Sequence, residues 1–501
     1  MKSVLEWLEA SSERLPDKIC IADPEHELSF SELAARAQAA GSWIAAKSPA
    51  REGVALYLEK SAPALAAMLG AAYAGCFYSV LDVTQPKTRI LASCEAIRPV
   101  CIVVDEASEA EAREVFADSG WELVRLDELL AAPADPALLA ERRAGACDID
   151  PLYVSFTSGS TGTPKGVVAT HRSVIDWICA FTETFDLTES DIHANQAPFD
   201  FDASVKDIYS MLRLGSRVQI VPRDYFKTPA KLMDYVSDSG ATVLVWAVSA
   251  MCFVSIMRGF DYRVPEHVRI VLFSGEVMPP KQLRRWQEAL PDAVFVNLYG
   301  PTEVTCNCTY HVVGRVYGND ETIPAGRAFA NERVFLLDED DREVSGPGAV
   351  GEICVAGSTL CSGYLGSPER TAEAFMQNPA NTRWLEPIYR TGDLARYDDA
   401  GELVYISRKD FQVKHMGHRV ELGDIEATAA GCAGVERACC AYDAKRDRIR
   451  LFYVGEIEEG ELDRRLREEL PAFMAPNSIA RLDEMPLSNN GKIDRKALQA
   501  L

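Results

Sequence analysis

The sequence predicts an α/β protein with a large N-terminal domain of α/β sheets, which includes a β subdomain, and a small α+β C-terminal domain. Two observations predict this class. Short apolar runs alternate with helical patterns from the N-terminus onward, which is the βαβ arrangement of a parallel sheet. After residue 409 the pattern changes to about 90 residues of mixed strand and helix. We therefore expect one domain at residues 1–409 and a second at residues 410–501.

The elements follow in order along the chain. Residues 1–18 have an amphipathic helix pattern, and residues 40–83 read as helix, strand, helix and strand. Residues 106–150 are rich in Ala, Glu and Asp and predict surface helix and loop. A second α/β series then begins at residue 151, and patterns typical of buried parallel strands recur at 241–248, 269–276 and 293–303. Residues 323–409 are rich in glycine and short strand patterns, which predicts the β subdomain.

Composition excludes several classes of function. The chain has 501 residues, is 48% hydrophobic and carries a net charge of −23. This charge argues against nucleic-acid or anionic-membrane partners, which favour basic surfaces. No apolar run approaches the ~20 residues of a membrane span, and the start of the chain is not a signal peptide. We expect a reduced, cytoplasmic protein whose Cys306 and Cys308 lie on one face of a strand and bind no metal.

Residues 157–166, TSGSTGTPKG, nearly match the P-loop that binds nucleotide phosphates. A P-loop has Ser or Thr after its lysine, but Gly166 follows Lys165, and Pro164 has no N–H for a phosphate. The hydroxyl and glycine content still suits a loop that follows phosphates without a rigid nest. A Gly/Ser surface turn is the alternative. The candidate phosphate contacts are Thr157, Ser158, Gly159, Ser160, Thr161, Gly162 and Lys165.

The segment NLYGPTE, residues 297–303, follows a buried strand pattern, and nucleotides bind at the carboxyl ends of such strands. Tyr299 can stack on a base, and Thr302 can bond to a phosphate. Glu303 supplies the oxygen ligand that Mg²⁺ prefers. The alternative for Glu303 is a helix cap.

Three more segments carry polar residues in suggestive positions. Asp393 in YRTGDLARY can accept hydrogen bonds from both ribose hydroxyls, although a turn aspartate is the alternative. Arg408 and Asp410 lie at the proposed domain boundary, where a hinge is expected. Lys492 follows an Asn–Gly turn near the C-terminus, a place where a lysine is usually solvated surface.

Together, and in this order, these segments resemble the AMP-forming adenylating enzymes of the ANL superfamily. The likeness is greatest to adenylation domains of nonribosomal peptide synthetases and to D-alanine:carrier-protein ligases. Residues 28–33 and 68–90 match early family motifs, although Ser79–Val80 stands where Val–Pro is usual. The resemblance covers essentially the whole chain.

The resemblance implies two half-reactions that use ATP and Mg²⁺. A carboxylate attacks the α-phosphate of ATP to give an acyl-adenylate and pyrophosphate, and a thiol then takes the acyl group and releases AMP. Lys492, Thr302 and Glu303 would act in catalysis, with Glu303 as the metal ligand. The ATP site would comprise the loop 157–165 together with Gly275, Glu276, Asn297, Tyr299, Gly300, Thr302, Asp393 and Arg408.

The resemblance also implies a mobile C-terminal domain. This domain would rotate about Asp410 between the half-reactions, so that Lys492 serves the first and the segment around Lys414 and Gly417 serves the second. Ser407 replaces a glycine of the usual pattern, and His415–Met416 replace Ile–Arg. These departures concern the contact with the carrier.

The segment FDFDASVKDIY, residues 199–209, resembles the wall of the acyl pocket. Asp202 aligns with the aspartate that binds the α-ammonium of an amino acid, and the alternative is a helix N-cap. The other pocket positions carry over as Phe201, Ala203, Lys206, a residue near Trp246, Leu272, Ser274, Leu298, Cys306 and Asn307.

The pocket positions favour a small, polar α-amino acid. Leu272, Ser274 and Leu298 resemble pockets for serine or cysteine, and glycine and D-alanine pockets are close. Lys206 would favour an acidic or carbonyl-bearing side chain such as aspartate if it faces inward, and is a surface lysine if it faces outward.

The sequence stops shortly after the last motif. We therefore expect a stand-alone enzyme of the kind used in nonribosomal peptide synthesis, with a free α-amino acid and a separate phosphopantetheinylated carrier protein as partners, or coenzyme A as acceptor. An acyl- or aryl-CoA ligase and a D-alanine:carrier-protein ligase for cell-wall modification are the alternatives.

Overall fold

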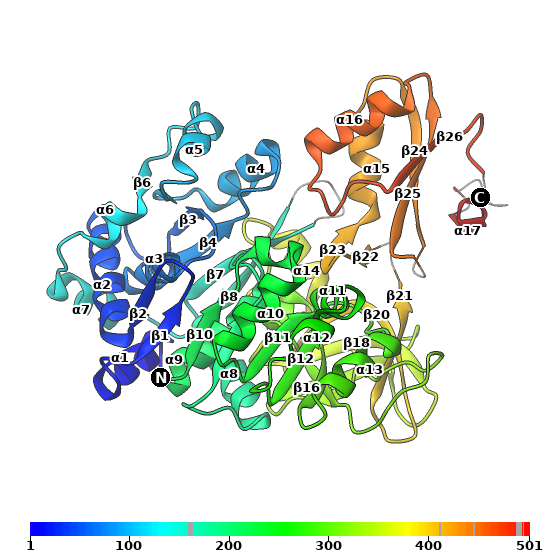
Figure 1. Cartoon of the computed structure of the whole chain (residues 1–501). Helices are drawn as coiled ribbons and strands as arrows, with labels where there is room; N and C mark the ends of the chain where they lie inside the picture. Colours follow the sequence, from blue (N-terminus) through cyan, green and yellow to red (C-terminus); the bar gives the residue numbers. More distant parts are fainter. Residues whose placement is uncertain (159–163, 410–411, 444–445, 487–492, 494, 501) are drawn as a thin grey trace. The chain divides into compact units, whose positions relative to one another are not determined.

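The computed structural model describes residues 1–158, 164–409, 412–443, 446–486, 493 and 495–500 (Figure 1). The chain divides into two compact units. Unit 1 comprises Met1–Val83, Ile97–Ser155 and Val167–Ser407, and unit 2 comprises Thr84–Ala96, Phe156–Gly166 and Arg408–Leu501. The α/β class predicted from the sequence is confirmed.

The largest sheet of unit 1 has nine strands in the order β15-β14-β13-β12-β11-β9-β10-β1-β2. Its central strands are parallel, and antiparallel strands close both edges. Because parallel strands end at one edge, β9, β11, β12 and β13 bring their last residues to the same side of the sheet. The bounds are β1 Ile19–Ala22, β2 Glu27–Ser29, β9 Ile192–Asn195, β10 Arg217–Ile220, β11 Val243–Ala247, β12 Ile270–Ser274, β13 Val294–Tyr299, β14 Thr309–Val312 and β15 Arg327–Ala328.

A second sheet has the order β6-β5-β3-β4-β7-β8. Strands β3 and β4 pair in parallel and flank helix α3, as the pattern of residues 40–83 predicts. Residues 106–150 form helices α5, α6 and α7, but they also contribute β6, which pairs with β5 and corrects the prediction of helix and loop alone. The strands are β3 Gly53–Tyr57, β4 Phe77–Leu81, β5 Ile102–Val104, β6 Leu123–Arg125, β7 Pro151–Thr157 and β8 Lys165–Thr170.

Helices cover both faces of the nine-stranded sheet. Large apolar side chains divide between two cores according to the two-residue period of the strands, so that Val245 and Leu272 join one core and Trp246 and Phe273 the other. Figure 1 shows α11 and α13 beside β11 and β12. The helices are α1 Leu5–Arg14, α2 Phe30–Lys47, α3 Ala62–Tyr73, α5 Glu109–Val115, α6 Leu126–Leu130, α7 Pro136–Ala144, α8 His171–Thr184, α9 Val205–Leu214, α10 Pro229–Asp238, α11 Val248–Ile256, α12 Gly259–Tyr262 and α13 Pro280–Ala289.

The predicted β subdomain is an antiparallel sheet in the order β17-β16-β18-β20-β19, with β21 paired to β20. Glycine-rich turns separate its strands, which is why the sequence shows short runs with little helical pattern. The elements are β16 Glu332–Leu337, β17 Glu343–Val344, β18 Val350–Gly357, α14 Pro368–Ala374, β19 Phe375–Gln377, β20 Pro387–Tyr397 and β21 Leu403–Arg408.

Unit 2 begins in the main at Arg408, two residues before the boundary that the sequence suggests, and it also takes in residues 84–96 and 156–166. Helices α15, α16 and α17 pack on the three-stranded sheet β24-β25-β26. None of the helices in the described part of the chain has both the length and the apolar character that a bilayer crossing needs. The elements are α4 Lys87–Ile97, β22 Gln412–His415, β23 His418–Glu421, α15 Leu422–Ala430, β24 Val435–Asp443, β25 Arg448–Gly455, α16 Glu459–Glu469, β26 Ser478–Arg481 and α17 Arg495–Ala500.

Candidate functional site

Lys206 lies in the first turn of helix α9, and its side chain is turned inward. It is 1% exposed, and its Nζ donates hydrogen bonds to Asn307 Oδ1 at 2.8 Å and Ser274 Oγ at 3.4 Å. Ser274 is the last residue of β12, and Asn307 precedes β14. Three positions that the sequence assigns to the amino-acid pocket therefore meet at one edge of the sheet.

Asp202 lies one helical turn before Lys206, in the 3₁₀ turn η1, Asp202–Ser204. It is 8% exposed, and its side chain forms a hydrogen bond with Thr302. Burial raises the pKa of this carboxyl, and the charge of Glu303 adds to that effect, while the Thr302 hydrogen bond and the Lys206 charge oppose it. The N-cap of α9 is Ser204, so the structure does not support the helix-cap alternative for Asp202.

Residues 305–308 form a tight loop against η1. Cys306 Sγ donates to the Asp202 carbonyl oxygen at 2.7 Å. Thr305 and Cys306 have φ values of 57° and 82°, an uncommon conformation for side-chain-bearing residues that concentrates at functional sites. A Cβ on Gly300 would lie 2.4 Å from Asn307 Cα, so the loop requires glycine there. The prediction that Cys306 and Cys308 lie on a strand is wrong, because β14 begins only at Thr309.

The strand period decides which apolar residues share this face. Leu272, Leu298 and Cys306 are buried in one core cluster, whereas Trp246 is in the other, where its indole contacts Trp286 and donates to the Ala194 carbonyl oxygen. The structure therefore separates Trp246 from the other pocket positions. Its neighbour Val245 belongs to the same core as Leu272 and takes its place as the candidate. Phe201 and Ala203, which flank Asp202, are partly exposed.

Strand β13 brings the proposed base-binding and ribose-binding residues together. Tyr299 is buried, and its hydroxyl donates to Asp393 Oδ2 at 2.5 Å. Asn297 Nδ2 donates to the Pro324 carbonyl oxygen at 2.8 Å, which fixes its amide. Gly275 and Glu276 follow β12, and Gly275 has a φ of 101°, which favours glycine.

Glu303 is fully buried in the 3₁₀ turn η3, Thr302–Val304, and accepts a hydrogen bond from the Tyr364 hydroxyl at 2.8 Å. No group of three or more His, Cys, Asp or Glu residues fit to hold a metal occurs among the described residues. A single carboxylate is the protein share expected when Mg²⁺ is bound mainly through substrate phosphates and water. Glu303 thus fits a nucleotide-bound Mg²⁺ and does not fit a closed metal cage.

Several predicted residues belong to unit 2. Ser158 Oγ donates to the Arg419 carbonyl oxygen at 2.5 Å, and Lys165 Nζ lies 3.6 Å from Glu421 Oε1. Lys414 is in β22, and Gly417, with a φ of 81°, is in the turn to β23. Thr157 ends β7 and Arg408 ends β21. Gly159, Ser160, Thr161, Gly162, Asp410 and Lys492 lie outside the described residues.

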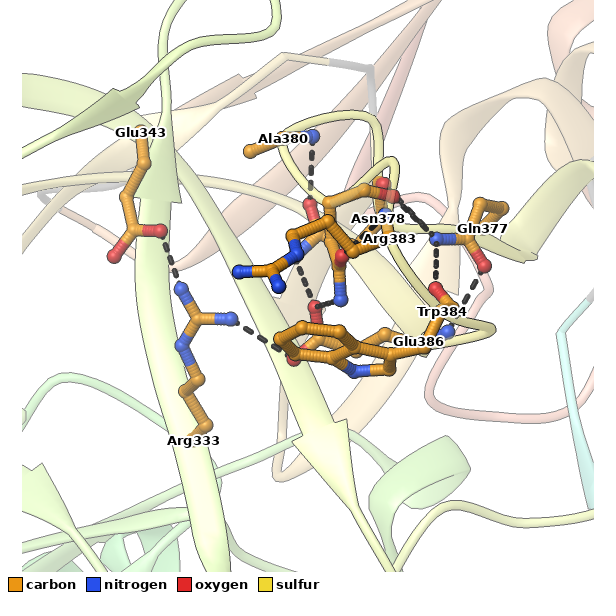
Figure 2. A network of polar contacts seen from close by, with 9 residues as sticks. Arg333, Glu343, Gln377, Asn378, Ala380, Arg383, Trp384 and Glu386 are labelled. Carbon is orange, nitrogen blue, oxygen red and sulfur yellow. Dashed lines mark hydrogen bonds and ion pairs between the residues drawn. The ribbon is translucent and has the colours of Figure 1, made fainter.

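A hollow of about 790 Å³ lies elsewhere in unit 1, and no predicted site residue lines it. Its rim includes the loop before β20, which internal hydrogen bonds hold in place. Asn378 Nδ2 donates to Glu386 Oε2, and Arg333 bridges Glu386 and Glu343 (Figure 2). One lining residue, Cys361, donates its N–H to the Glu303 carbonyl oxygen at 2.9 Å, so one residue of the wall is bonded to the Glu303 turn.

Comparisons with known proteins identify the family of the chain. The profile of the AMP-binding enzyme family matches residues 8–365. The chain is 33% identical to L-proline--[L-prolyl-carrier protein] ligase of Streptomyces coelicolor, covering 94% of this chain and 91% of that protein. It is 32% identical to tyrocidine synthase 3 of Brevibacillus parabrevis, covering 98% of this chain but 8% of that protein.

Solved structures extend the likeness to the fold. Holo-PA1221, a nonribosomal peptide synthetase protein that contains adenylation and PCP domains, superposes with a TM-score of 0.85 at 25% identity, covering 100% of this chain and 84% of that one. IdnL1 superposes with a TM-score of 0.83 at 28% identity, covering 97% and 99%. The chain therefore belongs to the AMP-binding enzyme family and is an AMP-forming adenylating ligase of the ANL superfamily.

Proposed function

We propose that this ligase activates a small, polar α-amino acid with ATP and passes the aminoacyl group to the phosphopantetheine thiol of a separate carrier protein. The observation that carries the proposal is Asp202, a buried carboxylate at the edge of the sheet where β12 and β13 end. A buried carboxylate needs a cationic partner, and the α-ammonium of an amino acid supplies one. A fatty or aryl acid would leave it without that partner.

In the first half-reaction, an oxygen of the substrate carboxylate forms a bond to the α-phosphorus of ATP. The bond from that phosphorus to the bridging oxygen breaks, and pyrophosphate leaves with the electron pair. This chemistry depends on positioning and on neutralising charge. Thr302 hydrogen-bonds with Asp202 and lies next to Glu303, so one short turn can hold amino acid, α-phosphate and Mg²⁺ in register.

The remaining residues fit ATP in the same scheme. Tyr299 and Asp393 are already joined by a hydrogen bond, which suits a base and ribose held side by side. Bound Mg²⁺ would neutralise phosphate charge, and Glu303 would hold it. Lys165 and the hydroxyls of residues 157–163 would hold the β- and γ-phosphates. Lys492 would bridge the α-phosphate and the attacking carboxylate.

In the second half-reaction, a thiolate attacks the carbonyl carbon of the aminoacyl-adenylate, and AMP leaves with the electron pair. We propose that residues 410–501 act as a mobile lid that turns about Asp410, which takes Lys492 away and brings Lys414 and Gly417 to the thiol. A separate carrier is supported by the relative that this chain matches over 91% of its length, since that enzyme is named for a prolyl-carrier protein.

Exchange of radiolabelled pyrophosphate into ATP tests the proposal. We expect exchange with at least one α-amino acid and none with the same carboxylic acid lacking its amino group. Asp202→Asn should reduce exchange by ~100-fold or more, since it removes the charge that faces the ammonium. Asp292→Asn, which changes an exposed aspartate, is the matched control.

Lys492→Ala should abolish adenylate formation without abolishing ATP binding. Unchanged exchange by Lys492→Ala would refute the role of that lysine. Equal activity with des-amino acids, retained in Asp202→Asn and followed by thioester formation on coenzyme A, would point instead to an acyl- or aryl-CoA ligase.

A further inference from the structure

Lys206 places a buried ammonium in the amino-acid pocket and gives it only neutral hydrogen-bond partners. Its Nζ contacts Asn307 Oδ1 and Ser274 Oγ. No ion pair joins this ammonium to a carboxylate among the residues that the structure describes. Lysine is almost never this deeply buried without a paired charge. A ligand with a negative charge can therefore supply the counter-charge that Lys206 lacks.

Two acidic residues close to Lys206 in the sequence, Asp202 and Asp207, form no ion pair with it among the described residues. Asp207, the next residue of α9, accepts a hydrogen bond from Asn195 Nδ2 at 2.9 Å, and its other oxygen lies 3.3 Å from His193 Nδ1. The thiol of Cys306 supplies no negative charge, because burial raises its pKa well above the usual value. Asp202 does not contact Lys206, but the two charges attract each other at longer range, because the Lys206 charge lowers the pKa of Asp202. This attraction reduces the cost of burying the Lys206 charge.

Lys206 and its two partners, Ser274 and Asn307, all have N–H or O–H groups that can donate to a ligand. A lysine ammonium has three N–H donors, and two of them are used here. Ser274 accepts from Lys206, which leaves its O–H free to donate. Asn307 accepts through Oδ1, which directs its NH₂ group to a different partner. Such a set of donors, with one full positive charge, suits a carboxylate and no cationic or apolar group.

Charge balance in the pocket also favours an acidic substrate, an argument that rests on the proposed function. When the α-ammonium of a substrate pairs with Asp202, the carboxylate that partly balances Lys206 is neutralised, and the α-carboxylate is directed to the α-phosphate of ATP. A neutral amino acid would then leave one buried positive charge in the side-chain pocket, whereas a substrate with a second carboxylate restores neutrality. We propose that the substrate is an acidic α-amino acid, whose side-chain carboxylate is bound by Lys206 together with Ser274 and Asn307.

Pairs of substrates that differ only in acid and amide test this on the unmodified protein. Pyrophosphate exchange would be measured with glutamate against glutamine and with aspartate against asparagine, in the full chain. We expect kcat/KM for one of the two acids to exceed that for its amide by ~100-fold or more, since the amide cannot match the buried charge. This arm needs no variant and so does not depend on folding.

Lys206→Met then tests whether this lysine is responsible. The acid-to-amide ratio should fall by ~100-fold or more, mainly through KM, because methionine keeps the length of the side chain without its charge. Lys227→Met, at an exposed lysine of the same unit, should leave the ratio unchanged. Lys206→Arg should keep a preference for the acid, although at a lower rate.

Three outcomes would overturn the inference. Better activation of a neutral amino acid than of either acid would refute it while leaving the proposed function in place. An acid preference that survives in Lys206→Met would show that another group reads the carboxylate. The absence of exchange with every amino acid would refute the proposed function, and the inference with it.

Discussion

Two lysines of unit 1, Lys60 and Lys206, place their side-chain nitrogens at the ends of strands of the nine-stranded sheet. Lys60 bonds to Asn195 at the end of β9, and Lys206 bonds to Ser274 at the end of β12, but the two nitrogens differ in the number of their acceptors. The Nζ of Lys60 lies within 3.3 Å of four oxygens, namely the carbonyl oxygens of Asn195, Gln196 and Ala197 and the side-chain oxygen of Asn195. The Nζ of Lys206 has two side-chain partners. Lys60 has more acceptors than donors, and Lys206 has more donors than acceptors.

This difference separates a structural lysine from a binding lysine. Lys60 holds the backbone that leads from β9 towards the pocket segment 199–209, and burial lowers its pKa to about 7. Both of its protonation states donate at least two hydrogen bonds, so its structural role does not depend on its charge. Lys206 has donor capacity and charge that the protein itself does not use.

The largest expected effect on stability comes from Lys60→Met. The Asn195 carbonyl oxygen would keep its hydrogen bond from the Val221 N–H, but the other three oxygens would lose the Lys60 donor. Unsatisfied buried acceptors are costly, so we expect the free energy of unfolding to fall by about 3 kcal/mol. The midpoint of the first urea-unfolding transition, followed by tryptophan fluorescence, measures this. Activity with all amino acids should fall together, with no change in their ranking. A variant with wild-type stability would contradict the structural role.

Lys206→Met should have the opposite profile. Removing a buried charge that lacks a contacting counter-charge relieves a desolvation cost, which offsets the two lost hydrogen bonds, so stability should change by less than about 1 kcal/mol. The same urea titration checks it. A loss as large as that of Lys60→Met would mean that Lys206 is a structural residue and would remove the basis of the comparison.

The pH dependence of substrate binding offers a third distinction. Burial raises the pKa of Asp202. As the pH falls, its carboxylate therefore becomes protonated at a higher pH than an ordinary aspartate would, and the affinity for the α-ammonium is lost in that range. The Lys206 charge lowers this pKa, and Lys206→Met should therefore move the acid limb of the KM profile to higher pH. Lys60→Met should not move it. An acid limb that is identical in all three proteins would contradict the assignment of Asp202.

A smaller effect is expected at Glu303. The Tyr364 hydroxyl orients this carboxylate, and Tyr364→Phe should raise the Mg²⁺ concentration needed for half-maximal exchange by about 3–10-fold, the net value of one typical hydrogen bond. Titration of Mg²⁺ at saturating ATP measures it. Neither lysine variant should shift this titration, and a shift of the same size in Lys206→Met would argue that the metal and amino-acid sites are coupled.

The sequence predicts the fold well because its strand and helix periods are regular. The βαβ pattern of residues 40–83 and the glycine-rich strands from β16 to β21 appear as predicted. The first strand of the predicted β subdomain, β15, pairs instead with β14 in the nine-stranded sheet. Strand β6 is missed because three residues within an acidic, alanine-rich stretch give too short a pattern. The two cysteines at 306 and 308 suggest a strand, but the close approach of Gly300 to Asn307 bends the chain there, and no local pattern reports such a contact.

The site is predicted unevenly for a similar reason. Asp202, Ser274 and Asn307 are found through motifs. The choice between Val245 and Trp246 depends instead on strand register: Val245 pairs with Leu272 and shares its core, so the alternation of the two strands could have identified it. The orientation of Lys206 could not be decided from the sequence. Residues four apart, such as Asp202 and Lys206, share a face only if both lie in one helix, and the sequence does not show whether that face is turned towards the pocket. Tyr364 and Lys60 act through partners 61 and 135 residues away, a distance that local patterns do not cover.

The most direct test is the affinity of non-hydrolysable aminoacyl-sulfamoyl adenosines, measured by calorimetry with the full chain. We predict that the glutamyl or the aspartyl compound binds ~100-fold or more tightly than its amide counterpart, and that Lys206→Met reduces this difference to a few-fold. Equal affinity for acid and amide in the unmodified protein would contradict recognition of a side-chain carboxylate by Lys206.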